Sequence, residues 1–74
     1  MGKLRVLSGP QVCRILAEHG FVMVRQKGSH ISMQKLIPGS SVTVVIPEHK
    51  EIRKGTLLSI IRQSGLDREL FETD

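Results

Sequence analysis

A hairpin signal at residues 20–32, GFVMVRQKGSHIS, constrains the fold more than any other stretch of the chain. The four residues after Gly20, FVMV, are types that suit a pleated, half-buried strand. Gly28 and Ser29 suit a hairpin turn, because glycine tolerates the positive φ that tight turns require. The stretch therefore predicts a strand over residues 21–25, a basic turn over 26–29 and a second strand over 30–35.

The second strand alternates apolar and polar residues. Ile31 and Met33 alternate with His30, Ser32 and Gln34. Because side chains point alternately to the two faces of a sheet, Ile31 and Met33 are predicted to face the core. His30 is then predicted to face solvent at the exit of the turn.

A capped helix is predicted over residues 10–19, ahead of the hairpin. Ser8 and Gln11 have the spacing of a capping box, and Pro10 fits the first turn. Gly20 ends the helix. His19, in the last turn, is placed to satisfy terminal carbonyls. The face predicted to be apolar carries Val12, Ile15, Leu16 and His19, with Cys13 at its border as a small core residue.

A third strand over residues 42–46 and a second helix over 57–64 complete the predicted elements. Thr56 is the predicted cap of that helix and Gly65 its end. Short connections make sequential strands neighbours, so the fold class is α+β with the order α-β-β-β-α in a single domain, residues 1–74. We expect a three-stranded antiparallel sheet with both helices on one face. The other, wet face is expected to carry His30, Ser32, Gln34, Thr43 and Val45.

Charge and composition narrow the function. The 74 residues carry 11 Lys and Arg against 7 Asp and Glu, a net charge of +4, which points to a polyanion such as nucleic acid. There is no Trp or Tyr and only two Phe, so aromatic platforms for stacking single-stranded bases are nearly excluded. The single cysteine fits a reducing cytoplasm, and the absence of an 18-residue apolar run argues against a membrane partner.

His30 is the strongest candidate for chemistry. The three histidines are widely spaced without accompanying ligands, so we expect no metal site and no cofactor. RNA cleavage needs little more than a proton carrier and positive charge, because the 2′-hydroxyl of the RNA is itself the nucleophile. His30 can carry the proton, and Arg25, Lys27 or Lys35 can neutralise the developing charge. The alternative without function is a surface histidine on a basic hairpin. The other candidate for proton transfer is His49.

The motifs G-F-x-x-x-R-Q-x-G-S-H and K-G-T-L-x-x-I, in this order, resemble the HicA toxin family, also called YcfA-like mRNA interferases. The resemblance covers roughly residues 7–66. It implies a double-stranded-RNA-binding-domain-like fold, ribosome-independent mRNA cleavage and a HicB-type antitoxin. We expect the cleavage to need no metal, because the nucleophile is internal to the RNA. It also implies that His30, the histidine of the G-S-H motif, is catalytic. Ile31 departs from the family, which often has a polar or aromatic residue there.

The resemblance thus predicts an endoribonuclease toxin that is a monomer when free and a hetero-oligomer with its antitoxin. The residues expected to contact mRNA around His30 are Arg25, Lys27, Gly28, Ser29 and Lys35. A noncatalytic double-stranded-RNA-binding module is the first alternative, although the basic cluster that it needs at the start of the last helix is reduced to Arg53 and Lys54, which precede that helix. A pure interaction protein that binds an acidic partner is the second.

Overall fold

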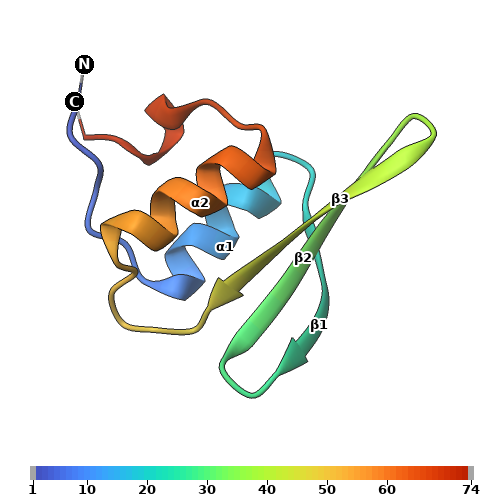
Figure 1. Cartoon of the computed structure of the whole chain (residues 1–74), viewed down its shortest axis with the longest axis horizontal. Helices are drawn as coiled ribbons and strands as arrows, with labels where there is room; N and C mark the ends of the chain where they lie inside the picture. The colour runs from blue at the N-terminus through green and yellow to red at the C-terminus, as the bar shows by residue number, and fades with distance from the viewer. Residues whose placement is uncertain (1, 74) are drawn as a thin grey trace.

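A computed structural model describes residues 2–73 as two helices packed against one face of a three-stranded sheet (Figure 1). The order α-β-β-β-α expected from the sequence is confirmed, with a short 3₁₀ helix after the second helix. The elements are α1 Gly9–Glu18, β1 Val22–Lys27, β2 His30–Ile37, β3 Ser40–Pro47, α2 Lys54–Ser64 and η1 Arg68–Phe71.

The sheet is an antiparallel meander in the order β1-β2-β3, as predicted. Gly28 and Gly39 occupy the two hairpin turns with φ of 59° and 74°, values that favour glycine. β2 pairs with β3 along its whole length, from His30 opposite Pro47 to Ile37 opposite Ser40. β1 is shorter, and its pairing with β2 begins only at Val22 opposite Gln34. The β2–β3 hairpin therefore continues past β1 as a projecting arm, residues 35–42 (Figure 1).

The core lies between the helices and one face of β2 and β3. Ile31 and Met33 are buried on this face, and His30 is exposed on the other, as the alternation predicted. The apolar face predicted for the first helix is buried, apart from His19, which is half-buried, and α2 buries Leu57, Ile60, Ile61 and Ser64. The apolar core consists of Leu7, Val12, Ile15, Leu16, Phe21, Ile31, Met33, Val44, Ile46, Ile52, Leu57, Ile60, Ile61 and Phe71.

The start and end of α1 follow the sequence signals. Ser8 Oγ accepts from the Gln11 backbone N–H, and Gln11 Oε1 accepts from the Ser8 N–H, which completes the capping box. At the other end His19 Nδ1 lies 2.8 Å from the carbonyl oxygen of Ile15, so the imidazole satisfies a last-turn carbonyl as expected. Gly20 follows with φ of 94°.

The start of α2 was predicted wrongly. The helix begins at Lys54 after Arg53, and Thr56 lies inside its first turn without a capping role. The cause is Ile52, which is buried and donates its N–H to the carbonyl of Leu7 at 2.7 Å. Because Ile52 is fixed in the core, the helix begins two residues later, at Lys54, and not at Leu57 as predicted. Packing rather than a side-chain cap therefore determines where α2 begins.

The burial of β1 was also predicted wrongly. Phe21 is buried, but it precedes the strand, and every residue of β1 is exposed. β1 is an edge strand that the helices do not cover, so even Met23, paired with the buried Met33, is 60% exposed.

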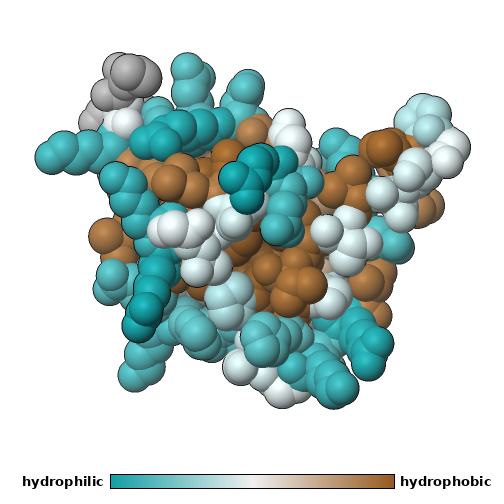
Figure 2. Space-filling view, in the orientation of Figure 1, coloured by the Kyte–Doolittle hydropathy of each residue, from teal (hydrophilic) through white to brown (hydrophobic). Residues whose placement is uncertain are grey.

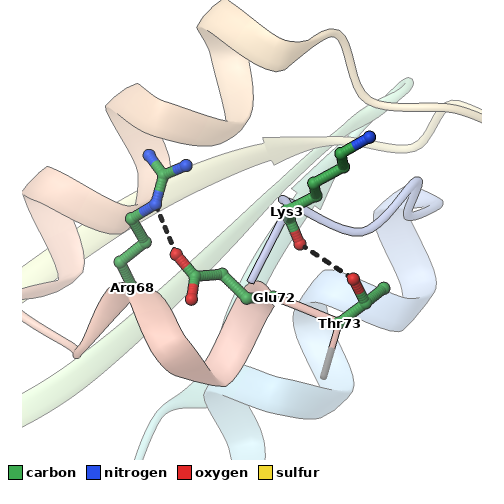
Figure 3. Close-up of polar contacts among 4 residues, drawn as sticks. All are labelled: Lys3, Arg68, Glu72 and Thr73. Atoms are coloured by element: carbon green, nitrogen blue, oxygen red, sulfur yellow. Dashed lines mark hydrogen bonds and ion pairs between the residues drawn. The ribbon is translucent and has the colours of Figure 1, made fainter. Parts of the chain in front are cut away.

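The first and last described segments lie side by side (Figure 1). Arg5 donates its N–H to the carbonyl of Phe71, and Thr73 donates its N–H to the carbonyl of Lys3, both at 2.8 Å. Figure 3 shows the Thr73 hydroxyl on the same Lys3 carbonyl and an ion pair between Arg68 and Glu72. Among residues 2–73, no helix combines the length and apolar character needed to cross a membrane.

Candidate functional site

His30 lies at the start of the central strand, on the face of the sheet that the helices leave open. Its cross-strand partners are Lys27 on β1 and Pro47 on β3. Residues directly opposite each other in a sheet point to the same face, so the Lys27 side chain accompanies His30. The imidazole is exposed, and a substrate can reach it from solvent.

A β-bulge places Arg25 on the same face. The register shifts between Met23 and Arg25, where two residues of β1 advance against one of β2, so Val24 is the extra residue. Strict alternation would put Arg25 on the same face as Met23, which is paired with Met33 on the helix side. With the bulge, Arg25 pairs with Ser32 and joins the open face. The bulge therefore gathers both cations around His30.

These side chains line a shallow depression. Its walls are Arg25, Lys27, Gly28, Ser29, His30, Ser32 and Val45. Within residues 2–73 the one ion pair joins Arg68 to Glu72, so Arg25 and Lys27 have no carboxylate partner in the part of the chain described. Unpaired cations beside an open concavity favour an anionic ligand.

Hydrogen bonds connect the turn before His30 to Glu48, the residue that follows β3. The Glu48 backbone N–H donates to the carbonyl of Ser29 at 2.6 Å. Gln26 pairs with the buried Ile31, so its side chain points away from the open face. Gln26 Nε2 donates to the Gly28 carbonyl at 3.3 Å and to Glu48 Oε2 at 3.2 Å. We call this set of bonds the turn clamp.

The structure brings together most of the predicted site residues. Arg25, Lys27, Gly28 and Ser29 all line the depression with His30. Lys35 does not, because it pairs with Val42 and its Nζ lies 5.9 Å from the centre of the Phe21 ring on the helix side of the sheet.

His49 is also absent from the depression. It lies in the loop after β3, where its carbonyl accepts the N–H of Gly9 at 2.8 Å.

Neither the turn clamp nor the bulge was predicted from the sequence. Gln26 is part of the R-Q-x-G-S-H motif, and that was the available signal for the clamp. Ser32 and Val45 were expected on the wet face, but their place in the depression follows from their shared register with Arg25. No comparable sequence pattern marks Val24 as a bulge residue.

The arrangement fits proton transfer at an anionic group. An imidazole can accept or donate a proton near neutral pH, and two adjacent cations can hold and stabilise a phosphate. No three His, Cys, Asp or Glu side chains of residues 2–73 come together in the way that metal ligands do.

Comparison with known proteins gives one result that agrees with this site. None of the curated proteins matches the chain. A family model described as "HicA toxin of bacterial toxin-antitoxin" matches residues 9–66, which is well over half of the chain and spans both helices, the sheet and the whole depression. The chain therefore belongs to the HicA toxin family of bacterial toxin–antitoxin pairs.

Proposed function

We propose that the protein is a toxin endoribonuclease that cleaves mRNA and uses His30 as its proton-transfer residue. The observation that carries this proposal is the placement of His30 with Arg25 and Lys27 on one open sheet face. Membership of a toxin family supports it. The depression is shallow and exposed, which suits a flexible polymer better than a small molecule that must be enclosed.

In the proposed reaction, the RNA 2′-hydroxyl oxygen attacks the adjacent phosphorus. His30 takes the hydroxyl proton as the new O–P bond forms while water protonates the departing 5′-oxygen, or water takes the hydroxyl proton while His30 protonates the 5′-oxygen as the old bond breaks. The products are a 2′,3′-cyclic phosphate and a 5′-hydroxyl. Arg25 and Lys27 stabilise the extra negative charge on the phosphorane. Because the nucleophile belongs to the substrate, the chemistry requires neither an activated water nor a metal ion.

The test is cleavage of a defined RNA in the presence of a chelator. We expect cleavage of the all-ribose RNA and none of the same RNA with one 2′-deoxy sugar at the cut site. His30→Ala should slow cleavage about 10²-fold or more while RNA binding and the fold persist. His49→Ala is the matched control, since it removes an exposed imidazole outside the depression.

Three outcomes would contradict the proposal. Cleavage of the deoxy substrate at an equal rate would exclude the internal nucleophile. An active His30→Ala variant beside an inactive His49→Ala variant would move the proton transfer to His49. Retained RNA binding without any cleavage by the wild-type protein would instead favour the noncatalytic RNA-binding module.

We further propose that a HicB-type antitoxin inhibits the toxin by covering the open face and burying His30, so that the free monomer becomes part of a hetero-oligomer. Family membership implies an antitoxin partner, and the cations of the depression favour acidic or polar groups on it. Hydrogen exchange of the complex should show protection over residues 27–32. Protection confined to α2 would rule out simple occlusion of the site.

A further inference from the structure

The projecting arm carries apolar side chains that the fold does not use. Leu36 is 78% exposed and Ile37 is 40% exposed, and both lie beyond the point where β1 and the helices cover the hairpin. Figure 2 shows apolar atoms on this arm, in the same position that the β2–β3 hairpin occupies in Figure 1. Exposed apolar side chains that gather in one place mark surfaces that bind other molecules.

Val22 extends this apolar surface onto β1. It pairs with Gln34, which lies two residues before Leu36 on β2, so Val22 and Leu36 share the open face. Val22 is 61% exposed, and β1 is the outer strand of the sheet on that side. We define the arm patch as Val22 and Leu36, because Ile37, the next residue of β2, points to the opposite face.

The arm patch and the depression lie on one continuous strand. Leu36, Gln34, Ser32 and His30 alternate along β2 and face the same side. Leu36 lies six positions after His30, which corresponds to about 20 Å in an extended strand. A standard protein interface buries about 800 Å² on each partner, a patch wide enough to cover both features at once.

Charge distinguishes the possible occupants. A second copy of this chain would approach with a net charge of +4 and with its own cations next to the same patch, so it would be repelled. RNA offers phosphates and bases, and neither gains from contact with an aliphatic arm that lacks aromatic rings. A protein whose apolar surface is flanked by carboxylates satisfies both the arm patch and the depression.

We infer that the arm patch is the apolar anchor of an acidic protein partner, which inhibits the toxin by reaching from the arm to His30. This inference rests on the proposed function for the identity of the partner as the antitoxin. The open face of the sheet then has two functions, since the arm patch binds the partner and the depression binds and cleaves RNA.

The experiment compares arm variants with a control of equal exposure. Leu36→Ser and Val22→Ser, the two arm variants, remove the apolar anchor. Val6→Ser removes an apolar side chain that is 76% exposed on the N-terminal segment, outside the arm. Affinity for a purified HicB-type antitoxin is measured by titration, and RNA cleavage is measured without antitoxin. Leu36→Thr, which keeps a strand-forming residue, replaces Leu36→Ser if the latter fails to fold.

We expect the arm variants to bind the antitoxin at least tenfold more weakly, to cleave RNA at the wild-type rate and to resist inhibition. Val6→Ser should change neither quantity by more than about twofold. Wild-type affinity in the arm variants, or equal weakening by Val6→Ser, would overturn the inference. Loss of cleavage with affinity retained would assign the arm to RNA instead, and dimerisation of the toxin that Leu36→Ser abolishes would assign it to a second copy.

Failure of the proposed function gives a different result. If the wild-type protein binds the antitoxin but does not cleave RNA, the arm variants still decide the inference through affinity alone.

Discussion

Gln26 shows how a single side chain off the reactive face can control the residue on it. The hydrogen bonds that its side-chain amide donates to the Gly28 carbonyl and the Glu48 carboxylate are exposed to solvent. Each therefore contributes about 0.5 kcal/mol or somewhat more to stability. The turn that they hold delivers His30 to the sheet, and small displacements of a reacting group are costly in rate. The role of Gln26 is therefore expected in catalysis more than in folding.

We predict that Gln26→Ala slows RNA cleavage about threefold to tenfold while the RNA affinity stays the same. Gln34→Ala is the control, because Gln34 bonds only to the Ser41 hydroxyl in the described structure and lies outside the depression. Single-turnover rates and equilibrium binding of an uncleavable RNA separate the two quantities. A variant that loses affinity but keeps its rate would show that Gln26 acts on binding instead of on the position of His30.

Cys13 is a second residue whose surroundings determine its chemistry. Partial burial raises the pKa of its thiol, and the negative charge of Glu48 adds to the rise. A raised pKa means that the folded state disfavours the thiolate. The folded state therefore loses stability as the pH rises through that pKa. At lower pH the thiol is protonated in both the folded and the unfolded state, so it does not change the stability.

We predict that Cys13 in the native protein reacts with iodoacetamide several-fold more slowly at pH 8 than in the guanidinium-unfolded chain. Raising the pH to 10 should narrow the difference, because more of the native thiol is then ionised. Equal native and unfolded rates at pH 8 would contradict the burial of this thiol.

At the scale of elements, the approach of α1 to the end of β3 depends on Gly9. A Cβ at this position would lie 2.2 Å from the carbonyl oxygen of Pro47 and 2.9 Å from Cα of Glu48, both of which are backbone atoms. The Gly9 N–H also donates to the His49 carbonyl, so the helix cannot withdraw without losing that bond. The same contact supports the Glu48 segment that forms part of the turn clamp.

We predict that Gly9→Ala lowers the free energy of unfolding by about 1–3 kcal/mol, the usual cost of overpacking. Gly55→Ala is the control within α2, because nothing lies within 4 Å of the added Cβ. That change should raise the free energy of unfolding by about 0.5 kcal/mol through the better helix propensity of alanine. Urea denaturation measures both, and a Gly9→Ala variant as stable as wild type would show that α1 and β3 do not pack this closely in solution.

The elements also show what sequence can and cannot predict. Ser8, Gln11 and the alternation from His30 to Met33 are local signals, and each gave the correct helix start or strand face. The start of α2 and the exposure of β1 depend on distant packing, namely the burial of Ile52 and the reach of the helix layer. Local patterns contain neither fact.

The candidate site divides in the same way. The G-S-H motif pointed to His30, and neighbouring positions suggested Arg25 and Lys27. Arg25 reaches the same face as His30 and Lys27 only because of the bulge at Val24. Strict alternation along β1 would place Arg25 on the helix side of the sheet. Lys35 was grouped with them by its position in the chain, yet it belongs to the other face.

At the scale of the whole molecule, the sheet separates the positive charges of its own strands into two groups. Arg25 and Lys27 lie on the open face with His30, and Lys35 lies on the helix side over Phe21. Replacing any one of them by alanine changes the net charge by the same amount, from +4 to +3. Only the local position of the charge then distinguishes the variants, so they can test which face the RNA occupies.

We predict that Arg25→Ala and Lys27→Ala each reduce the slope of log affinity against log salt concentration by about 0.7, the contribution of one phosphate contact on a single strand. Lys35→Ala should leave the slope nearly unchanged, since its ammonium group faces away from the depression. Binding is measured on RNA with a 2′-deoxy sugar at the cut site, which prevents cleavage during titration. Equal reductions in all three variants would mean that RNA responds to the total charge or wraps both faces, and the open face would then lose its status as the RNA-binding surface.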